Sequence, residues 1–195
     1  MAAQTAGFAT PATLITNNGD AAAAWAAASP PGDLLYKAFF CQGVQDGGMV
    51  PASRIDPAGL PGGDLYAAST FQQVITGQPI RVTMVGDRIF AAAIEGQDGQ
   101  LDWRPGQQDA ALHPVPVPPD TQARLRCFMA DSGLAYGGFD FITDHDGQWW
   151  FLEVNPSGQY GFVEIKAGLQ ITAAIADLLC HTRSPAPTTA REVAQ

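Results

Sequence analysis

Glu153 and Asn155 carry oxygen atoms at the spacing of a cation site. They are two residues apart in an apolar run of strand length, residues 149–155. Side chains alternate between the two faces of a strand, so both point to the same face. Carboxylate and amide oxygens suit a hard cation such as Mg²⁺, which keeps part of its coordination shell for phosphate. The spacing therefore predicts a magnesium and nucleotide site.

Asp140 joins this set if the strand-like segment before the run forms a hairpin with it. A four-residue turn at 144–147 places Asp140 opposite Phe151. Asp140 then shares a face with Glu153 and is its diagonal neighbour, at roughly 7–8 Å between Cα atoms. The alternative is an ordinary hairpin with an acidic exposed face, and the parity fails if the hairpin carries a single bulge.

The composition limits the class of protein. The chain has 195 residues, 46% of them hydrophobic and 15% charged, which fits a globular protein with a substantial core. Its formal charge of −9 repels phosphate backbones and anionic lipid surfaces, so we expect no nucleic-acid partner and no membrane partner. Three cysteines without paired spacing, each beside apolar residues, predict reduced and buried thiols. We expect a cytoplasmic protein.

Helix and strand patterns alternate along the chain. A Gly-, Pro- and Asp-rich segment at 42–63 reads as a long irregular loop of the kind that often carries function. Hydrophobic patterning and cap residues predict helices at about 21–28, 120–132 and 167–181, and strands at 34–40, 69–75, 80–85, 88–94, 138–143 and 148–155.

Two segments near the C-terminus carry a family resemblance. Residues 133–140 read Gly-Leu-Ala-Tyr-Gly-Gly-Phe-Asp, and residues 151–159 read Phe-Leu-Glu-Val-Asn-Pro-Ser-Gly-Gln. Together they resemble the C-terminal signature of RimK-like ATP-grasp ligases. Within that superfamily the chain is most similar to the microviridin-type, or graspetide, peptide ligases, through residues 71–75, 80–87, 90–94 and 102–104.

The resemblance implies an α+β ATP-grasp fold, in which two lobes with antiparallel sheets enclose an ATP cleft. Residues 1–70 would form the N-terminal lobe with its long loop, and residues 71–182 the C-terminal lobe with the hinge, metal and nucleotide site. Residues 183–195 would be a flexible tail. The Gly-x-x-x-Pro segment of the family falls at 7–11, so we expect the family's N-terminal pre-ATP-grasp domain to be lacking.

The resemblance also implies two kinds of site residue. One kind binds the metal through side-chain oxygen atoms, and the other contacts adenine through the main chain. The metal-ligand set agrees with the strand parity argued above, whereas the adenine contacts use main-chain groups and leave a weak trace in the sequence. The family's magnesium ligands match Asp140, Glu153 and Asn155, and the hinge backbone that meets adenine matches Gln73, Val74 and Ile75.

Two cations complete the expected site. Lys37 matches the strand lysine that reaches the nucleotide phosphates, and Arg81 matches the arginine that contacts the terminal phosphate and the developing acyl-phosphate. A planar, permanently charged guanidinium suits that second role. The alternatives are a lysine on an edge strand with its ammonium in solvent, and a strand arginine paired with a surface acid. The residues 102–104 would shape the peptide-facing side.

The implied function is an ATP- and Mg²⁺-dependent ligase. It would activate Asp or Glu side chains of a ribosomal precursor peptide as acyl-phosphates, which a hydroxyl or amine attacks to give ester or amide crosslinks. Two alternatives stay open: a RimK-like ligase that adds an amino acid to a carboxylate, and a truncated, non-catalytic remnant that binds nucleotide or a leader peptide. The oligomeric state also stays open, with a homodimer among the options.

Overall fold

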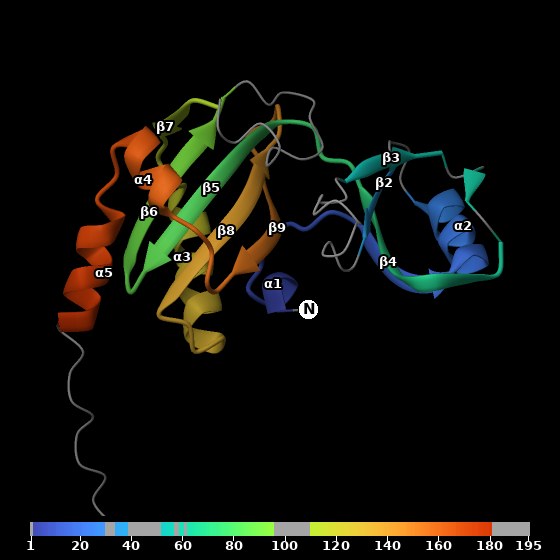
Figure 1. Ribbon diagram of the computed structural model, residues 1–195, viewed down its shortest axis with the longest axis horizontal. Coiled ribbons are helices and arrows are strands. Elements are labelled where there is room, and N and C mark those ends of the chain that lie inside the picture. Colours follow the sequence, from blue (N-terminus) through green and yellow to red (C-terminus); the bar gives the residue numbers. More distant parts are fainter. Residues whose placement is uncertain are drawn as a thin grey trace, which may run out of the picture.

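The computed structural model shows two lobes, each built on an antiparallel sheet (Figure 1). It describes residues 2–29, 34–38, 52–56, 59–60, 62–95 and 110–180. One sheet has four strands and the other has five, and helices pack against both. The α+β, two-lobed architecture predicted from the sequence is therefore confirmed.

The first lobe is a four-stranded sheet with one helix, in the strand order β1-β4-β2-β3. The helix starts after Asn18, whose side chain accepts a hydrogen bond from the amide of Ala21 at 2.8 Å. The predicted strands did not include β1 or β3, and β3 lies within the segment expected to be a long loop. The elements are β1 (Thr13–Asn18), α2 (Gly19–Ala28), β2 (Leu34–Ala38), β3 (Ser53–Ile55) and β4 (Asp64–Gln73).

The second lobe is a five-stranded sheet in the order β7-β6-β5-β8-β9. Its strands are β5 (Gln78–Val85), β6 (Arg88–Ile94), β7 (Leu112–Pro114), β8 (Tyr136–Thr143) and β9 (Trp149–Asn155). Its helices are α1 (Ala2–Thr5), α3 (Pro119–Asp131), α4 (Gly161–Ala167) and α5 (Ile171–Cys180). The bounds of β5, β6, β8, β9 and α3 lie within two residues of those predicted from the sequence.

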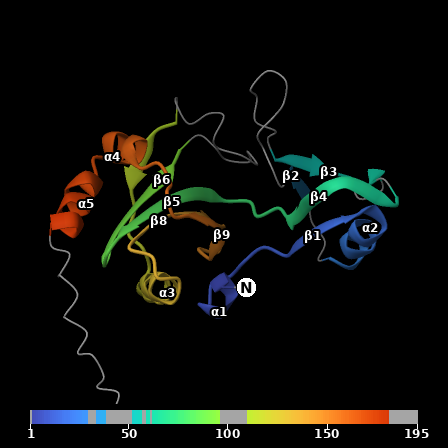
Figure 2. The same cartoon turned by 60° about the horizontal axis from the view of Figure 1, so that its bottom comes forward.

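Each face of the five-stranded sheet carries a hydrophobic core. Figure 2 shows α3 on one side of this sheet and α4 and α5 on the other. On one face Val82 packs with Leu125 of α3. On the other face Val85 packs with Val163 of α4 and Ile171 of α5. In Figure 1, α4 and α5 lie on the β6 side of the sheet, while β8 and β9 lie on the side nearer the four-stranded sheet. Part of the second face is thus left for a site between the lobes.

The C-terminal helical region departs from the prediction of one helix at 167–181. Gly168 adopts a left-handed conformation with a φ of 66° and ends α4, which starts at Gly161. Glycine takes this conformation without the steric cost of a Cβ atom. The side chain of Glu164 then accepts hydrogen bonds from the amide and hydroxyl of Thr172. These bonds support the start of α5, so two helices meet at a corner.

The beginning of the chain packs on the second lobe, whereas the predicted boundary placed it in the first. Phe8 is 5% exposed and stacks on Phe151, with 5.4 Å between ring centroids. The carbonyl of Ala9 accepts a hydrogen bond from the amide of Phe151 at 2.8 Å. Within the described residues, the segments 10–12 and 74–77 cross between the lobes (Figures 1 and 2).

Cysteine burial was predicted wrongly. Cys127 and Cys180 are both exposed, and Cys41 lies outside the described residues. In α3 the inward positions, spaced by three and four residues, belong to Leu125, Phe128 and Met129, so position 127 faces solvent.

No helix in the described part of the chain has the length and apolar character needed to cross a bilayer.

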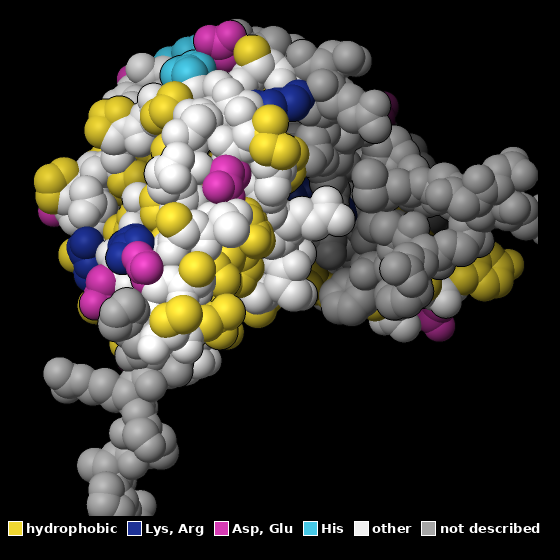
Figure 3. All heavy atoms as spheres, turned by 60° about the vertical axis from the view of Figure 1, so that its left-hand side comes forward, with side chains coloured by type: hydrophobic (Ala, Val, Ile, Leu, Met, Phe, Trp, Pro, Cys, Tyr) yellow, Lys and Arg dark blue, Asp and Glu magenta, His cyan; other side chains and the backbone are white. Residues whose placement is uncertain are grey.

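The helical face of the second lobe also exposes hydrophobic side chains. Ile165 on α4 is 83% exposed and Leu179 on α5 is 69% exposed. Figure 3 views the molecule from this side and shows hydrophobic side chains interspersed with charged ones. The mixture of the two kinds is ordinary for a protein surface.

We predict that Phe8→Ala destabilises the second lobe by about 3–5 kcal/mol, because it removes a buried ring from the Phe8–Phe151 stack and leaves a cavity. Urea denaturation followed by tryptophan fluorescence measures the change. Tyr66→Ala is the matched control, since Tyr66 is fully exposed and its loss should cost less than about 0.5 kcal/mol. Equal losses in the two variants would contradict the assignment of residues 2–9 to this core.

Candidate functional site

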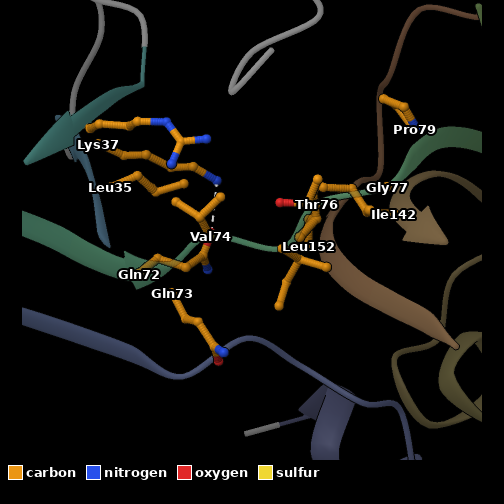
Figure 4. A pocket seen from close by; sticks show the side chains of 12 residues that line it. Leu35, Lys37, Gln72, Gln73, Val74, Thr76, Gly77, Pro79, Ile142 and Leu152 are labelled. Atoms are coloured by element: carbon orange, nitrogen blue, oxygen red, sulfur yellow. Dashed lines mark hydrogen bonds between the residues drawn. The ribbon is translucent and has the colours of Figure 1, made fainter. Parts of the chain in front are cut away.

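A pocket lies between the two lobes, against the crossing segment 74–77 (Figure 4). The four-stranded sheet forms one wall, the crossing segment the back, and residues of β5, β8 and β9 the other wall. The residues that line it are Leu35, Lys37, Arg54, Gln72, Gln73, Val74, Ile75, Thr76, Gly77, Pro79, Ile142 and Leu152. Four of the predicted site residues, Lys37, Gln73, Val74 and Ile75, are therefore brought together here.

Lys37 reaches this pocket from an interior strand. β2 lies between β4 and β3, so the alternative of an edge-strand lysine is wrong. Lys37 pairs with Thr70 on β4, and Leu35 pairs with Gln72, which places these side chains on one face of the sheet. The ammonium of Lys37 donates to Oε1 of Gln72 at 3.1 Å (Figure 4). Gln72 in turn donates to the hydroxyl of Thr13 at 2.9 Å, which fixes its amide.

The crossing segment is held on both sides. The amide of Gln73 donates to the carbonyl of Ala12 at 2.9 Å, which ties the two crossing segments together. Gly77 packs directly against the backbone of Thr143, and a Cβ atom at this position would overlap the Thr143 carbonyl. A glycine is thus required where the segment enters β5. The main chain of Val74 and Ile75 runs between these two anchors, along the pocket.

The metal-ligand candidates pair more closely than the sequence predicted. Asp140 lies directly opposite Glu153, not opposite Phe151. The loop between β8 and β9 spans the five residues 144–148 rather than four, which shifts the register by one. A bulge next to Asp140 shifts it by one more. Two shifts of one residue each leave the side chains on their original faces. The prediction that Asp140 and Glu153 share a face is therefore confirmed, whereas the predicted diagonal arrangement is wrong.

Arg81 lies beside Asp140 on the neighbouring strand, so Arg81, Asp140 and Glu153 form a row across β5, β8 and β9. We call it the carboxylate row. It pairs with Asp140 across β5 and β8, and its Nη1 donates to Oδ1 of Asp140 at 2.8 Å. Cβ atoms at Gly138 and Gly158 would each lie 2.6 Å from Nη2 of Arg81, so the guanidinium lies in a slot between two glycines. Only 7% of the Arg81 side chain is exposed. The alternative of a surface-paired arginine is therefore wrong.

The electrostatics of Asp140 reflect this enclosure. Burial raises the pKa of its carboxyl above the usual aspartate range, the nearby Arg81 opposes that increase, and the negative charge of Glu153 adds to it. A second cation beside the two carboxylates would relieve their repulsion. Asp140 and Glu153 are therefore candidate ligands for a positive ion, which would offset this charge pair.

Asn155 lies two residues beyond Glu153 on β9 and on the same face. It pairs with Gly138 on β8, just as Glu153 pairs with Asp140. Its Oδ1 accepts hydrogen bonds from the amide of Ser157 at 2.9 Å and from the Ser157 hydroxyl at 3.4 Å, and these bonds orient the side chain. In the described residues no three His, Cys, Asp or Glu side chains cluster as metal ligands, so the candidate set consists of two carboxylates and one amide.

The pocket and the carboxylate row lie on one continuous strand surface. Pro79 and Ile142 line the pocket, and they are a register pair on β5 and β8. The next pair on the same face, two residues along each strand, is Arg81 and Asp140. Two residues of strand correspond to about 7 Å. A ligand of nucleotide length could extend from the pocket to the carboxylates over this surface.

Some residues of the site were not identified from the sequence. Arg54 lines the pocket from β3, where it pairs with Leu35, but its strand lay in the presumed loop. Gln72 positions Lys37, yet it reads as an ordinary strand residue. Gly158 falls within the quoted signature, although its contact with Arg81 is visible only in three dimensions. The predicted peptide-facing residues 102–104 lie outside the described residues.

Comparison with solved structures gives similar ATP-grasp ligases. A RiPP-associated ATP-grasp ligase of Chryseobacterium gregarium, solved with ADP and a leader and core peptide, is 25% identical with a TM-score of 0.80; the match covers 91% of this chain and 56% of that one. The macrocyclase MdnC of Microcystis aeruginosa, bound to the precursor peptide MdnA, is 29% identical with a TM-score of 0.76, over 92% of this chain and 58% of MdnC.

A more distant structure shares the fold. D-cycloserine synthetase DcsG is 14% identical with a TM-score of 0.59, over 91% of this chain and 66% of that one. No protein-family model matches the chain, and no curated protein matches it. The chain spans somewhat more than half the length of the first two ligases. It has the two-lobed fold of ATP-grasp ligases and is similar to those associated with ribosomally synthesised peptides.

Proposed function

We propose that this chain forms the nucleotide and metal site of an ATP-dependent ligase that activates carboxylates of a ribosomal precursor peptide. The observation that carries this proposal is the continuity of the inter-lobe pocket with the row formed by Arg81, Asp140 and Glu153. Similarity to ligases solved with precursor peptides supports the substrate class.

The nucleotide would bind with its base in the inter-lobe pocket. Gln73, Val74 and Ile75 line this pocket, and the main chain of Val74 and Ile75 would offer hydrogen-bonding groups to an adenine edge. The ammonium of Lys37 points into the pocket from the four-stranded sheet (Figure 4). It would neutralise the negative charge of the nucleotide phosphates close to the base. The strand face would then lead the remaining phosphates toward Asp140.

Mg²⁺ fits the oxygen set of Asp140, Glu153 and Asn155. The pKa of Asp140 is raised first by burial and to a smaller extent by the charge of Glu153, and the two carboxylates lie on a face that leads to the pocket. When bound, the ion would offset phosphate charge and leave coordination positions for the nucleotide. Asp140 is held by Arg81, so its carboxylate is oriented before the ion arrives.

Arg81 would act chiefly through the groups that it holds. Its Nη1 is engaged with Asp140, and its Nη2 donates to the carbonyl of Gln159 at 3.3 Å. Nε is buried without a hydrogen-bond partner among the described atoms. This arrangement supports a role in orienting the metal site. The contact of Arg81 with the terminal phosphate, expected from the resemblance, remains a prediction.

The proposed reaction has two steps. The terminal phosphoryl group of ATP moves to a peptide carboxylate, which gives an acyl-phosphate and ADP. A hydroxyl or amine of the same peptide then attacks the acyl carbon, phosphate leaves, and an ester or amide closes a ring. No covalent enzyme intermediate is needed, so the residues of this chain contribute orientation and charge stabilisation.

Incubation of the chain with ATP, Mg²⁺ and a candidate precursor peptide tests this function by mass spectrometry. We expect the peptide to lose the mass of one water for each ring formed. A mass gain equal to an added amino acid would point to the RimK-like alternative. An unchanged peptide, together with no consumption of ATP, would contradict the ligase proposal for the chain as it stands.

We predict that Asp140→Asn and Glu153→Gln each lower the affinity for Mg²⁺-ADP by tenfold or more, a cost of about 1.4 kcal/mol or above. Both variants keep the side-chain volume and remove a charged metal ligand. Calorimetric titration with ADP, with and without Mg²⁺, measures the effect. Asp131→Asn is the control, because Asp131 is exposed at the end of α3 on the opposite face. Unaltered Mg²⁺ dependence in both variants would refute the metal site.

Arg81→Lys should reduce turnover at least about tenfold more than it reduces nucleotide affinity. A lysine ammonium keeps the charge beside Asp140, but it cannot make the bidentate contact with the transferring phosphoryl group that the resemblance predicts for Arg81. The kcat for ATP consumption and the Kd for Mg²⁺-ADP give the two quantities, after a melting curve has shown that the variant is folded. Equal losses would indicate that Arg81 serves only the structure of the site.

A further inference from the structure

The loop between β9 and α4 is held down by side chains from two other strands. This loop comprises residues 156–160 and follows Asn155 directly. The hydroxyl of Tyr136, at the start of β8, donates a hydrogen bond to the carbonyl of Gly158. The guanidinium of Arg81, on β5, donates to the next carbonyl, that of Gln159, at 3.3 Å. Two consecutive carbonyls of the loop thus have donors from the sheet.

The same loop returns three hydrogen bonds to Asn155. The amide of Gly158 donates to the main-chain carbonyl of Asn155 at 3.2 Å. The amide and the hydroxyl of Ser157 both donate to the side-chain Oδ1 of Asn155, at 2.9 Å and 3.4 Å. Tyr136 is therefore connected to both the backbone and the side chain of Asn155 through a single turn. A shift of Gly158 would move the groups that orient the Asn155 amide.

The contact between Tyr136 and the loop leaves little freedom. Gly158 is buried against the Arg81 guanidinium, where a Cβ atom would lie 2.6 Å from Nη2. The ring of Tyr136 lies 6.2 Å from that of Tyr160 in an edge-on arrangement. Partial burial raises the pKa of the Tyr136 hydroxyl above its ordinary value, so the group stays a proton donor. The proposed chemistry does not use this hydroxyl.

We propose that Tyr136 is a positioning residue that sets the Mg²⁺ affinity of the site. Its hydroxyl holds the Gly158 carbonyl, the 156–160 loop keeps its turn, and the turn presents Oδ1 of Asn155 beside the two carboxylates. This inference rests on the proposed function, since it requires a metal at Asp140, Glu153 and Asn155. Tyr136 is not among the residues that line the nucleotide pocket, and its hydroxyl bonds to the loop, so it acts through the loop.

Tyr136→Phe removes the hydroxyl and keeps the ring. We expect the Mg²⁺ concentration needed for half-maximal ADP binding to rise about three- to tenfold, the range for loss of one hydrogen bond. Binding of ADP in EDTA should stay within about twofold of the wild type, because the inter-lobe pocket is unchanged. Tyr160→Phe is the matched control, since it removes a hydroxyl from the neighbouring ring, and we expect wild-type behaviour from it.

Calorimetry with ADP at stepped Mg²⁺ concentrations gives these values. An unchanged Mg²⁺ requirement in Tyr136→Phe would overturn the inference. Equal weakening with Mg²⁺ and in EDTA would overturn it as well, because a general loss of structure would explain both. A wild-type protein that binds ADP without any Mg²⁺ dependence would refute the metal site and this inference with it, and that outcome is visible before any variant is made.

Hydrogen exchange gives a second measurement that does not depend on the metal. In the nucleotide-free protein, amides of residues 157–160 should exchange faster in Tyr136→Phe than in the wild type, while the amides of β5 should not change. If the Mg²⁺ requirement rises but the exchange of these loop amides stays the same, positioning through the loop is wrong. Faster exchange throughout the second lobe would instead show a loss of stability, and would also overturn the inference.

Discussion

The buried pair of Arg81 and Asp140 constrains the surface around it. Two charges withdrawn from water are tolerated only while they remain paired and hydrogen-bonded, and removal of one partner typically costs about 3–5 kcal/mol. Because the guanidinium lies flat in its slot, the strand beneath it and the loop above it both carry glycine, at positions 138 and 158. The pair thus explains two glycines and the orientation of one carboxylate.

The two faces of the five-stranded sheet divide structural and functional tasks. One face is filled by aromatic rings, including Phe8, Phe139 and Phe151, which pack with α3 and with the start of the chain. The other face carries an apolar area under α4 and α5 and, beyond it, the polar row with Asp140. Strand alternation lets a rigid aromatic core lie directly beneath the polar row without any residue serving both.

The inter-lobe pocket depends on how the two crossing segments are anchored at each lobe. Gln73 binds the main chain of Ala12, so the two crossing segments support each other. Gly77 lets the second of them approach the Thr143 backbone at the point where β5 begins. Lys37 reaches the pocket from the first lobe, whereas the carboxylates come from the second. A ligand that spans both would therefore contact groups from each lobe.

The sequence by itself determined the features that depend on local backbone geometry. Alternation within residues 149–155 placed Glu153 and Asn155 on one face, and hydrophobic patterning located seven of the fourteen described elements within two residues. Tertiary structure decided the features that depend on distant partners: the loop length and bulge that put Asp140 opposite Glu153, the entry of Arg54 into the pocket, and the burial of Arg81. Alternation is a property of one strand, whereas register, burial and side-chain contacts are set by the neighbours against which that strand packs.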